Sequence, residues 1–177
     1  MASDFSEALS LSLTGRRHVD EDSSYAELLA DLAAAAGSKA AAARALGVSP
    51  TTFYRWVSGR SSRPGRPAQR PSVPKATIVK AIRARQLSPD LAQRIRDKRA
   101  TIKIKGYFIV SSDSRKHPRT IHCGRDFPAS VQGEILDAWL DGNDELAEQI
   151  TFDAIGEYYV EGMDIDGIVS IEWENNG

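Results

Sequence analysis

The chain has 177 residues, of which 41% are hydrophobic and 27% are charged, and its net charge is −1. This composition is typical of a soluble globular protein with one large or two small domains. No apolar run of about 18 residues is present, so the sequence predicts no transmembrane helix. The N-terminal residues lack the positive start of a signal peptide, and the single cysteine, Cys123, excludes an internal disulfide and fits a reducing compartment. We therefore expect a cytoplasmic, nucleoid-associated protein with no membrane partner.

The charges are distributed unevenly along the chain. Residues 1–37 carry a net charge of −5, residues 38–105 a net charge of +15, and residues 106–177 a net charge of −11. Contacts to phosphate supply most of the affinity of DNA-binding proteins, and a basic block of this size provides them. The alternative is a solvated charged face, but the strong excess of one sign favours double-stranded DNA as a partner.

The first elements frame a helical domain over residues 25–100. Residues 1–24 are rich in serine and acids with scattered apolar residues, which predicts a flexible acidic tail. Residues 25–36 form a predicted helix that places Leu28, Leu29 and Leu32 on one face.

Residues 38–60 have the pattern of a helix-turn-helix. Alanine-rich residues 39–45 favour a helix, Gly47 suits a left-handed turn, and Ser49 and Pro50 are a typical N-cap and first helical residue. A second helix follows to about residue 57. The alternative is an ordinary alanine-rich helical hairpin, but the turn, the Ser-Pro start and the basic surroundings favour a DNA-binding helix-turn-helix.

The second of these helices is the predicted recognition helix. Phe53, Trp56 and Val57 recur at helical spacing and form its expected inward face. We expect the major groove to be contacted mainly by Thr51, Thr52, Tyr54 and Arg55. The full set of residues predicted to contact DNA is Ser49, Thr51, Thr52, Tyr54, Arg55, Arg60, Arg63, Arg66, Arg70 and Lys75.

A basic arm is predicted over residues 59–74, GRSSRPGRPAQRPSVP, because its prolines and glycines exclude a regular helix or a central strand. The order Arg63-Pro64-Gly65-Arg66-Pro67 resembles the core of an AT-hook, in which an extended strand inserts arginine into a narrow minor groove. Arg66 is the residue expected to enter the groove. The alternative is a basic loop that contacts phosphate only. Residues 75–99 return to a helical pattern that restarts at Ser88 and Pro89, with basic residues, Arg83 among them, on the outer faces.

The pattern changes to a small acidic α+β domain over residues 101–177. Strands are predicted at 102–110, 119–123 and 165–173, a polar turn at 111–118, and helices at 128–140 and 144–160, in the order ββααβ. The last strand suits a sheet edge, where it would pair two copies of the chain as a homodimer. The predicted fold class is therefore α+β, with an all-helical N-terminal domain followed by this smaller domain.

The segments AAARALGVSPTTFYRWV, GYFIVSSDSRK, DFPASVQGEILDAWLDGNDELAEQITFDAIGEYYVEG and IVSIEWEN together resemble the telomere-capping terminal proteins (Tpg) of linear actinomycete chromosomes and plasmids. The resemblance implies binding to telomeric DNA, covalent attachment of a side-chain hydroxyl to the 5′ end, and priming of a DNA polymerase. The implied attachment loop follows the first strand of the second domain, where Ser114 and Thr120 are the preferred candidates. The alternative for this loop is a solvated hairpin turn.

Other chemistries find little support in the sequence. His122 and Cys123 are adjacent on a predicted strand and would point to opposite faces, so we predict no metal site there. No cofactor motif is present, and we expect no stand-alone enzyme. The alternatives to a terminal protein are a helix-turn-helix transcriptional repressor with a C-terminal dimerisation domain, and an adaptor that recruits a replication or telomere-associated protein.

Overall fold

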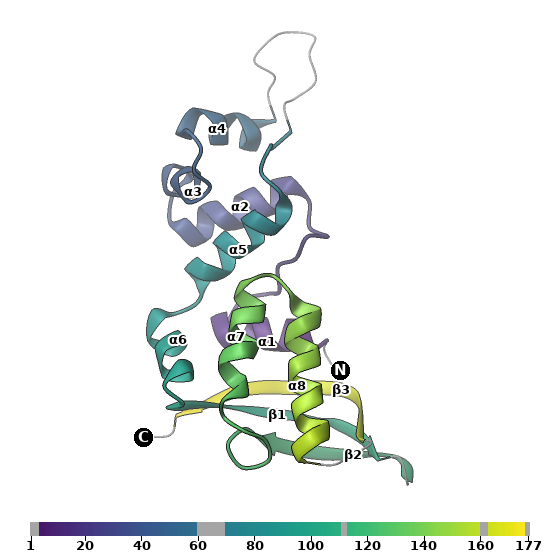
Figure 1. The fold of residues 1–177 in the computed structure, drawn as a ribbon. Helices are drawn as coiled ribbons and strands as arrows, with labels where there is room; N and C mark the ends of the chain where they lie inside the picture. The colour runs from purple at the N-terminus through teal and green to yellow at the C-terminus, as the bar shows by residue number, and fades with distance from the viewer. Residues whose placement is uncertain (1–3, 60–69, 111–112, 160–162, 176–177) are drawn as a thin grey trace. The chain divides into compact units, whose positions relative to one another are not determined.

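The computed structural model describes residues 4–59, 70–110, 113–159 and 163–175. It divides into two compact units. The helical unit is Val19–Gln86, and the sheet unit combines Met1–His18 with Leu87–Gly177. Helices in the N-terminal part and a three-stranded sheet later in the chain confirm the predicted mixture of helix and sheet (Figure 1). Within the described ranges, no helix has the length and apolar character needed to cross a membrane.

The helical unit is built from short helices with strong local end signals. Ser24, Ser38 and Ser49 each cap a helix by accepting a hydrogen bond from a backbone N–H of the first turn. The core contains Phe53 and Trp56 from the predicted inward face together with leucines and isoleucines of the flanking helices. The helices are α2 (Tyr25–Ala36), α3 (Lys39–Ala45), α4 (Pro50–Ser58) and α5 (Lys75–Gln86).

Helix α5 uses basic side chains to hold the start of the helical unit. Arg83 is 1% exposed, and its Nη2 donates to the carbonyl oxygen of Val19 at 2.7 Å. The sequence predicts Arg83 on an outer face, and that prediction is wrong. The backbone carbonyl that accepts from this guanidinium lies 64 residues earlier, where helical periodicity gives no sign of it.

The sheet unit contains an antiparallel sheet in the order β2-β1-β3. Its helices lie on one side of the sheet (Figure 1). The inner sheet face buries Ile102, Ile104 and Phe108 of the central strand against Leu136 and Trp139. The elements are β1 (Ala100–Val110), β2 (Asp113–His122), β3 (Met163–Asn175), α1 (Phe5–Thr14), α6 (Pro89–Arg96), α7 (Val131–Leu140) and α8 (Asp144–Tyr158).

Residues 5–14 form helix α1, where the sequence predicts a flexible tail. Asp4 caps this helix, and Phe5, Leu9 and Leu13 are at most 4% exposed in the core of the sheet unit. The intervening serines also face inward: Trp139 Nε1 donates to Ser10 Oγ and Trp173 Nε1 donates to Ser12 Oγ. The inward stripe of α1 therefore includes serines, whose hydroxyls accept hydrogen bonds from the indoles of the buried Trp139 and the half-buried Trp173, and a search for apolar periodicity does not find such a stripe.

The predicted helical domain over residues 25–100 differs from the observed units at both ends. The helical unit begins at Val19 and ends at Gln86, and α6 belongs to the sheet unit. Ile95 of α6 is 1% exposed and lies in the core formed with the sheet. The sequence places α6 with the preceding helix because both have basic outer faces, whereas burial of its apolar side decides its position.

The predicted polar turn over residues 111–118 is mostly strand. Strand β2 already begins at Asp113, which is the Cα partner of Val110. Polar and turn-forming residues such as Lys116 and Pro118 lie within the ladder, opposite Ile109 and Tyr107. Pro118 is tolerated because β2 is an edge strand, so its missing N–H can face away from the ladder.

Candidate nucleic-acid interface

Helices α3 and α4 are joined by a tight turn in the helical unit. Gly47 has a φ of +66°, a left-handed conformation that suits glycine. The N–H of Val48 donates to the carbonyl of Ala43 at 3.0 Å, which closes the turn. Ala42 and Ala43 are fully buried, so the small side chains of α3 allow close packing of neighbouring helices. This is the helix-turn-helix arrangement that the sequence predicts.

One face of α4 is available to a ligand. Thr51, Tyr54, Arg55 and Ser58 follow a helical spacing of i, i+3, i+4 and i+7, and Tyr54 is 50% exposed. The opposite face carries the buried Phe53 and Trp56. This face therefore carries exposed hydroxyls and a phenol beside the half-buried Arg55, and hydroxyl, phenol and guanidinium groups all hydrogen-bond to base edges and phosphates.

Ser49 and Thr52, both predicted to contact DNA, are engaged with each other. The Thr52 N–H donates to Ser49 Oγ at 3.1 Å, and the two hydroxyl oxygens lie 2.9 Å apart. Thr52 is half-buried. The two side chains thus fix the start of α4, and Thr51 is the more exposed threonine of its first turn.

Lys39 is a member of this surface that the sequence does not reveal. Its Nζ lies 5.4 Å from the centroid of the Tyr54 ring, so α3 places a cation over the aromatic side chain of α4. The contact restrains the phenol and adds positive charge beside it. The signal in the sequence would be a basic residue at the start of the first helix, 15 residues before an exposed tyrosine.

The remaining predicted DNA contacts fall into three groups. Arg70 is exposed. Lys75 is half-buried; its Nζ donates to the carbonyl of Glu21 at 2.8 Å and lies 5.7 Å from the Tyr25 ring centroid, so it holds the segment before α2. The three arm residues Arg60, Arg63 and Arg66 lie outside the described residues.

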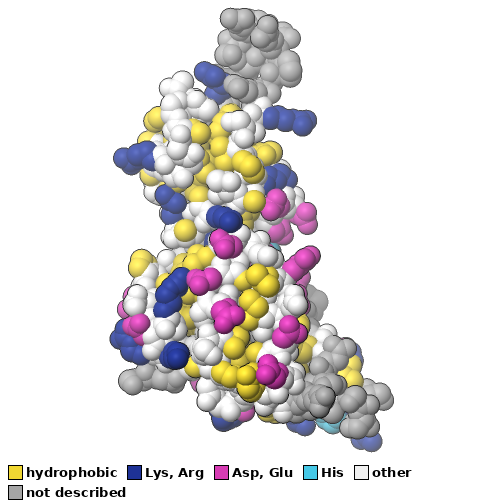
Figure 2. Space-filling view, in the orientation of Figure 1, with side chains coloured by type: hydrophobic (Ala, Val, Ile, Leu, Met, Phe, Trp, Pro, Cys, Tyr) yellow, Lys and Arg dark blue, Asp and Glu magenta, His cyan; other side chains and the backbone are white. Residues whose placement is uncertain are grey.

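The helical unit is basic and the sheet unit is acidic. The helical unit has eleven Lys and Arg against five Asp and Glu, and the sheet unit has twelve against nineteen. Figure 2 shows acidic side chains over helices α7 and α8 of the sheet unit. A DNA backbone would be attracted to the helical unit, which carries the exposed face of α4.

Comparison with known families supports this interface. Residues 21–55 match a family described as bacterial regulatory protein, Fis family. The match spans α2, α3 and the first part of α4, including Thr51, Tyr54 and Arg55. No curated protein and no solved structure matches the chain. The helix-turn-helix prediction is confirmed, and the chain carries a domain of the class that binds DNA sequence-specifically.

The two candidate attachment hydroxyls lie on strand β2 and not in a loop. Ser114 is in the first part of the strand, and Thr120 is half-buried opposite Lys105 of β1. Thr120 also lines a hollow of about 290 Å³ on the sheet. The resemblance implies an attachment residue in a loop, whereas Ser114 and Thr120 lie in a strand that pairs with β1.

His122 and Cys123 point in different directions, as their adjacency predicts. His122 Nδ1 lies 3.4 Å from Glu174, whereas Cys123 is 4% exposed. Burial raises the pKa of the Cys123 thiol to about 12. Among the described residues, no group of three His, Cys, Asp or Glu side chains is placed to hold a metal ion.

A row of serine, histidine and aspartate appears only in the folded chain. His18 Nδ1 lies 3.0 Å from Ser10 Oγ, and His18 Nε2 lies 3.5 Å from Asp144. The imidazole is turned relative to a hydrolase triad, in which Nε2 faces the serine. Ser10 is 3% exposed and accepts from Trp139 Nε1, so its oxygen is closed to a substrate. The row joins α1 to α7 and α8.

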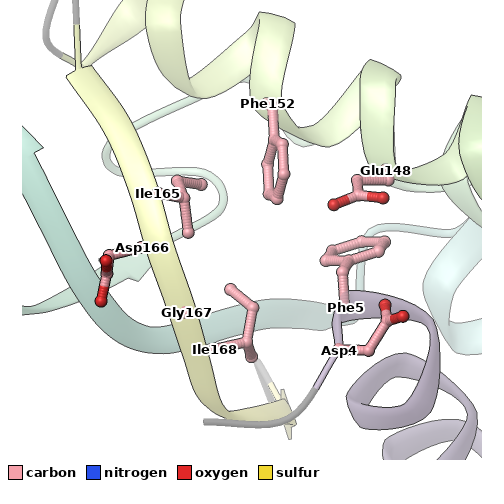
Figure 3. Close-up of a pocket in the computed structure, with 8 residues that line it drawn as sticks. All are labelled: Asp4, Phe5, Glu148, Phe152, Ile165, Asp166, Gly167 and Ile168. Carbon is pink, nitrogen blue, oxygen red and sulfur yellow. The ribbon is translucent and has the colours of Figure 1, made fainter.

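A hollow of about 340 Å³ is lined by the rings of Phe5 and Phe152, by the carboxylates of Asp4 and Glu148, and by the strand at Asp166, whose side chain points away from the rings (Figure 3). Asp166 pairs with Lys116 at 2.7 Å, and Asp4 accepts from the N–H of Ser6 at 3.0 Å. Burial, followed by the charges of Asp4 and Glu145, raises the pKa of Glu148. The carboxylates of Asp166 and Asp4 thus have roles in the fold, and burial disfavours the charged form of Glu148.

Proposed function

We propose that this protein is a sequence-specific regulator that binds double-stranded DNA by placing α4 in the major groove. Thr51, Tyr54 and Arg55 face the base edges, and Lys39 holds Tyr54 and approaches phosphate. The single observation that carries the proposal is the two-sided character of α4: a polar row, exposed at Thr51 and Tyr54, lies opposite the buried Phe53 and Trp56 within a basic unit. The match to bacterial regulatory proteins supports a regulatory role.

Arg55 is expected to supply the largest share of base discrimination. A guanidinium bonded to guanine O6 and N7 contributes about 1–3 kcal/mol of specificity. The test selects the preferred site from a random DNA pool and then compares the Arg55→Ala variant with the native protein on that site and on scrambled DNA. We expect a loss of about 10- to 100-fold on the selected site and little change on scrambled DNA.

Arg85→Ala is the matched control, because Arg85 is an exposed arginine of the same unit that donates to its own helix at the Ala81 carbonyl. It should leave the selected sequence unchanged. If Arg55→Ala and Arg85→Ala have equal effects, or if selection yields no preferred sequence, the proposal fails.

The terminal-protein role is a competing hypothesis that rests on the resemblance of the sequence. It requires that a hydroxyl such as that of Thr120 become linked to a nucleotide. Incubation with a replicative polymerase, a labelled deoxynucleotide and telomeric DNA would place covalent label on the protein, and Thr120→Val would abolish it. A regulator would instead remain unlabelled while it still protects its DNA site. The adaptor hypothesis predicts that loss of DNA binding leaves capture of a replication protein intact.

A further inference from the structure

The sheet of the sheet unit has one face without a helix among the described residues. Ile102, Ile104 and Phe108 of β1 point to the covered face and are fully buried. Strand side chains alternate, so Lys105 and Tyr107 point the other way, and Tyr107 is 41% exposed. Figure 1 shows α1, α7 and α8 on the covered side. We call the opposite side of the sheet, to which Lys105 and Tyr107 point, the open face.

The open face carries opposite charges at its two edges. On this face β2 carries Lys116 and His122 and no acid whose side chain the structure describes, while Arg119 lies opposite Gly106 and points to the covered side. On the same face β3 carries Asp166, Glu172 and Glu174. Within one chain, the central Lys105 is paired with Glu172 of β3 at 2.6 Å, and Lys116 of β2 with Asp166 at 2.7 Å. The charge therefore changes sign from one edge of the sheet to the other.

The centre of the open face is apolar and concave. A hollow of about 290 Å³ is lined by Tyr107, Pro118 and Val169, with Thr120 and Lys105 beside them. Val169 is 51% exposed because it is the extra residue of a bulge, where the register shifts between Lys105 and its neighbour in β1. An apolar centre with a charged border is the usual anatomy of a protein–protein interface.

We propose that the open face is a homodimer interface and that its occupant is a second copy of this chain. A two-fold axis along β1 lays one sheet on the other with β1 over β1. The same rotation sets the basic β2 of each copy over the acidic β3 of the other, so the charges attract on both sides. Tyr107 and Val169 meet across the axis in the apolar centre. The dimer goes beyond the DNA contact and does not require that α4 bind DNA.

The dimensions of the sheet predict a reversible dimer. Ten residues at about 3.3 Å per residue and three strands about 4.8 Å apart give a face of roughly 480 Å². Two such faces bury about 1,000 Å², near the lower limit for a specific interface. DNA is a poorer occupant, because Lys103 and Lys105 of this face are paired with Glu174 and Glu172 of β3, so the face presents no excess of positive charge to phosphates.

The first test measures the mass of the full chain by light scattering and sedimentation up to about 100 µM, which populates a dimer of micromolar Kd. We expect the mass to rise from 19.3 kDa towards twice that value. Tyr107→Asp should keep the chain monomeric over this range. Tyr158→Asp is the matched control, because Tyr158 is 55% exposed but lies on α8. Circular dichroism and the melting temperature verify that both variants fold.

The second test exchanges charges between the edges. A variant with both Lys116→Asp and Asp166→Lys keeps its internal pair and remains complementary to itself. Mixed with the native chain, it places like charges opposite each other, so energy transfer between labelled chains should report fewer mixed than pure dimers. The proposal is overturned if the native chain stays monomeric or if the two tyrosine variants have equal effects on its mass. It is also overturned if the exchanged variant mixes freely with the native chain. If the native chain is monomeric and Tyr107→Asp weakens its DNA binding, the open face is instead a DNA contact.

Discussion

The helical unit and the sheet unit use their basic residues in different ways. In the sheet unit, arginines of the basic block lie within hydrogen-bond distance of carboxylates: the pairs are Arg94–Asp90 at 3.0 Å, Arg96–Asp137 at 2.6 Å and Arg99–Asp97 at 2.8 Å. In the helical unit, Lys39 lies over Tyr54, and Arg44 and Arg70 are exposed. A continuous basic block in the sequence thus divides into a part that pairs with acids and a part in which Lys39, Arg44 and Arg70 are exposed.

This difference teaches that net charge along the sequence is a weak guide to a DNA-binding surface. Residues 38–105 carry a net charge of +15, but those after Gln86 belong to a unit whose acids outnumber its bases. Each exposed ion pair adds little to stability, about 0–1 kcal/mol. Its larger effect is that a paired arginine presents less positive potential to a phosphate. Contacts to DNA should therefore concentrate in the helical unit.

The largest expected effect comes from removing a buried aromatic ring from each unit. Phe53 and Phe108 are both fully buried, one in each core. Replacing either by alanine should cost about 3–5 kcal/mol of unfolding free energy, because it leaves a cavity. Phe53→Ala should abolish DNA binding, whereas Phe108→Ala should leave binding to a single site intact. Chemical denaturation and DNA binding by anisotropy measure the two effects.

Equal loss of DNA binding in the two phenylalanine variants would contradict the expectation that DNA contacts concentrate in the helical unit. It would mean that the two cores unfold together and that the helical unit cannot hold α4 without the sheet unit.

Gly106 of β1 lies close to the backbone of β3. A Cβ added to Gly106 would lie 2.7 Å from the carbonyl oxygen of Gly167 on β3. Gly106→Ala should therefore cost about 1–3 kcal/mol through overpacking. Gly133→Ala in α7 is the matched control, because an added Cβ there meets nothing within 4 Å, and it should stabilise the unit by about 0.4–1 kcal/mol. Thermal unfolding that shifts in the same direction for both variants would refute the close approach.

Local signals predicted the helical unit well. The predicted bounds of α2 and α3 agree with the structure, and the predicted α4 ends within one residue of Ser58. Each of these three helices begins with a serine cap, and α2 and α4 end at Gly37 and Gly59 in left-handed conformations. These signals lie within a few residues of the helix ends that they specify, so the sequence contains them. The polar row Thr51, Tyr54 and Arg55 follows from the same periodicity.

What the sequence could not predict depends on distant partners. The serines of α1 suggest a tail until Trp139 and Trp173 are placed against them. Strand β2 has the composition of a turn and is held in extended form by its pairing with β1. The Tyr54–Lys39 contact requires the turn angle between α3 and α4. In each case a tertiary contact overrides the local preference, and the local sequence pattern does not show that contact.

The third prediction tests the division of the basic block directly. Arg44 is exposed on α3, and we expect it to contact a phosphate. Arg44→Ala should therefore weaken binding to all DNA sequences and reduce the slope of log affinity against log salt concentration by about 1. Arg96 donates to Asp137 at 2.6 Å, so Arg96→Ala should leave the slope unchanged. Affinity measured across a series of salt concentrations reports both slopes. A larger change for Arg96→Ala would place the DNA surface in the sheet unit.

The smallest expected effect is a pH-dependent change within the acidic unit. Burial, with the charges of Asp4 and Glu145, raises the pKa of Glu148 above its usual 4.5. Below that value the carboxyl is protonated in both the folded and the unfolded chain, so it imposes no cost. As the pH rises through the folded pKa, ionisation becomes unfavourable in the folded chain and stability falls. Glu148→Gln should therefore raise the melting temperature at neutral pH, and the gain should disappear in acid.

Glu134→Gln, at an exposed position on α7, separates this local effect from the general benefit of removing one negative charge from a unit with a net charge of −7. The gain from Glu148→Gln should exceed that from Glu134→Gln at neutral pH, and the difference between the two variants should shrink as the pH falls below the usual value for glutamate. A difference that stays constant with pH would assign the effect to packing beside Phe152 and not to ionisation. Ionisation of Glu148 would then cost the sheet unit no stability, and the two units would differ only in how their basic residues are paired.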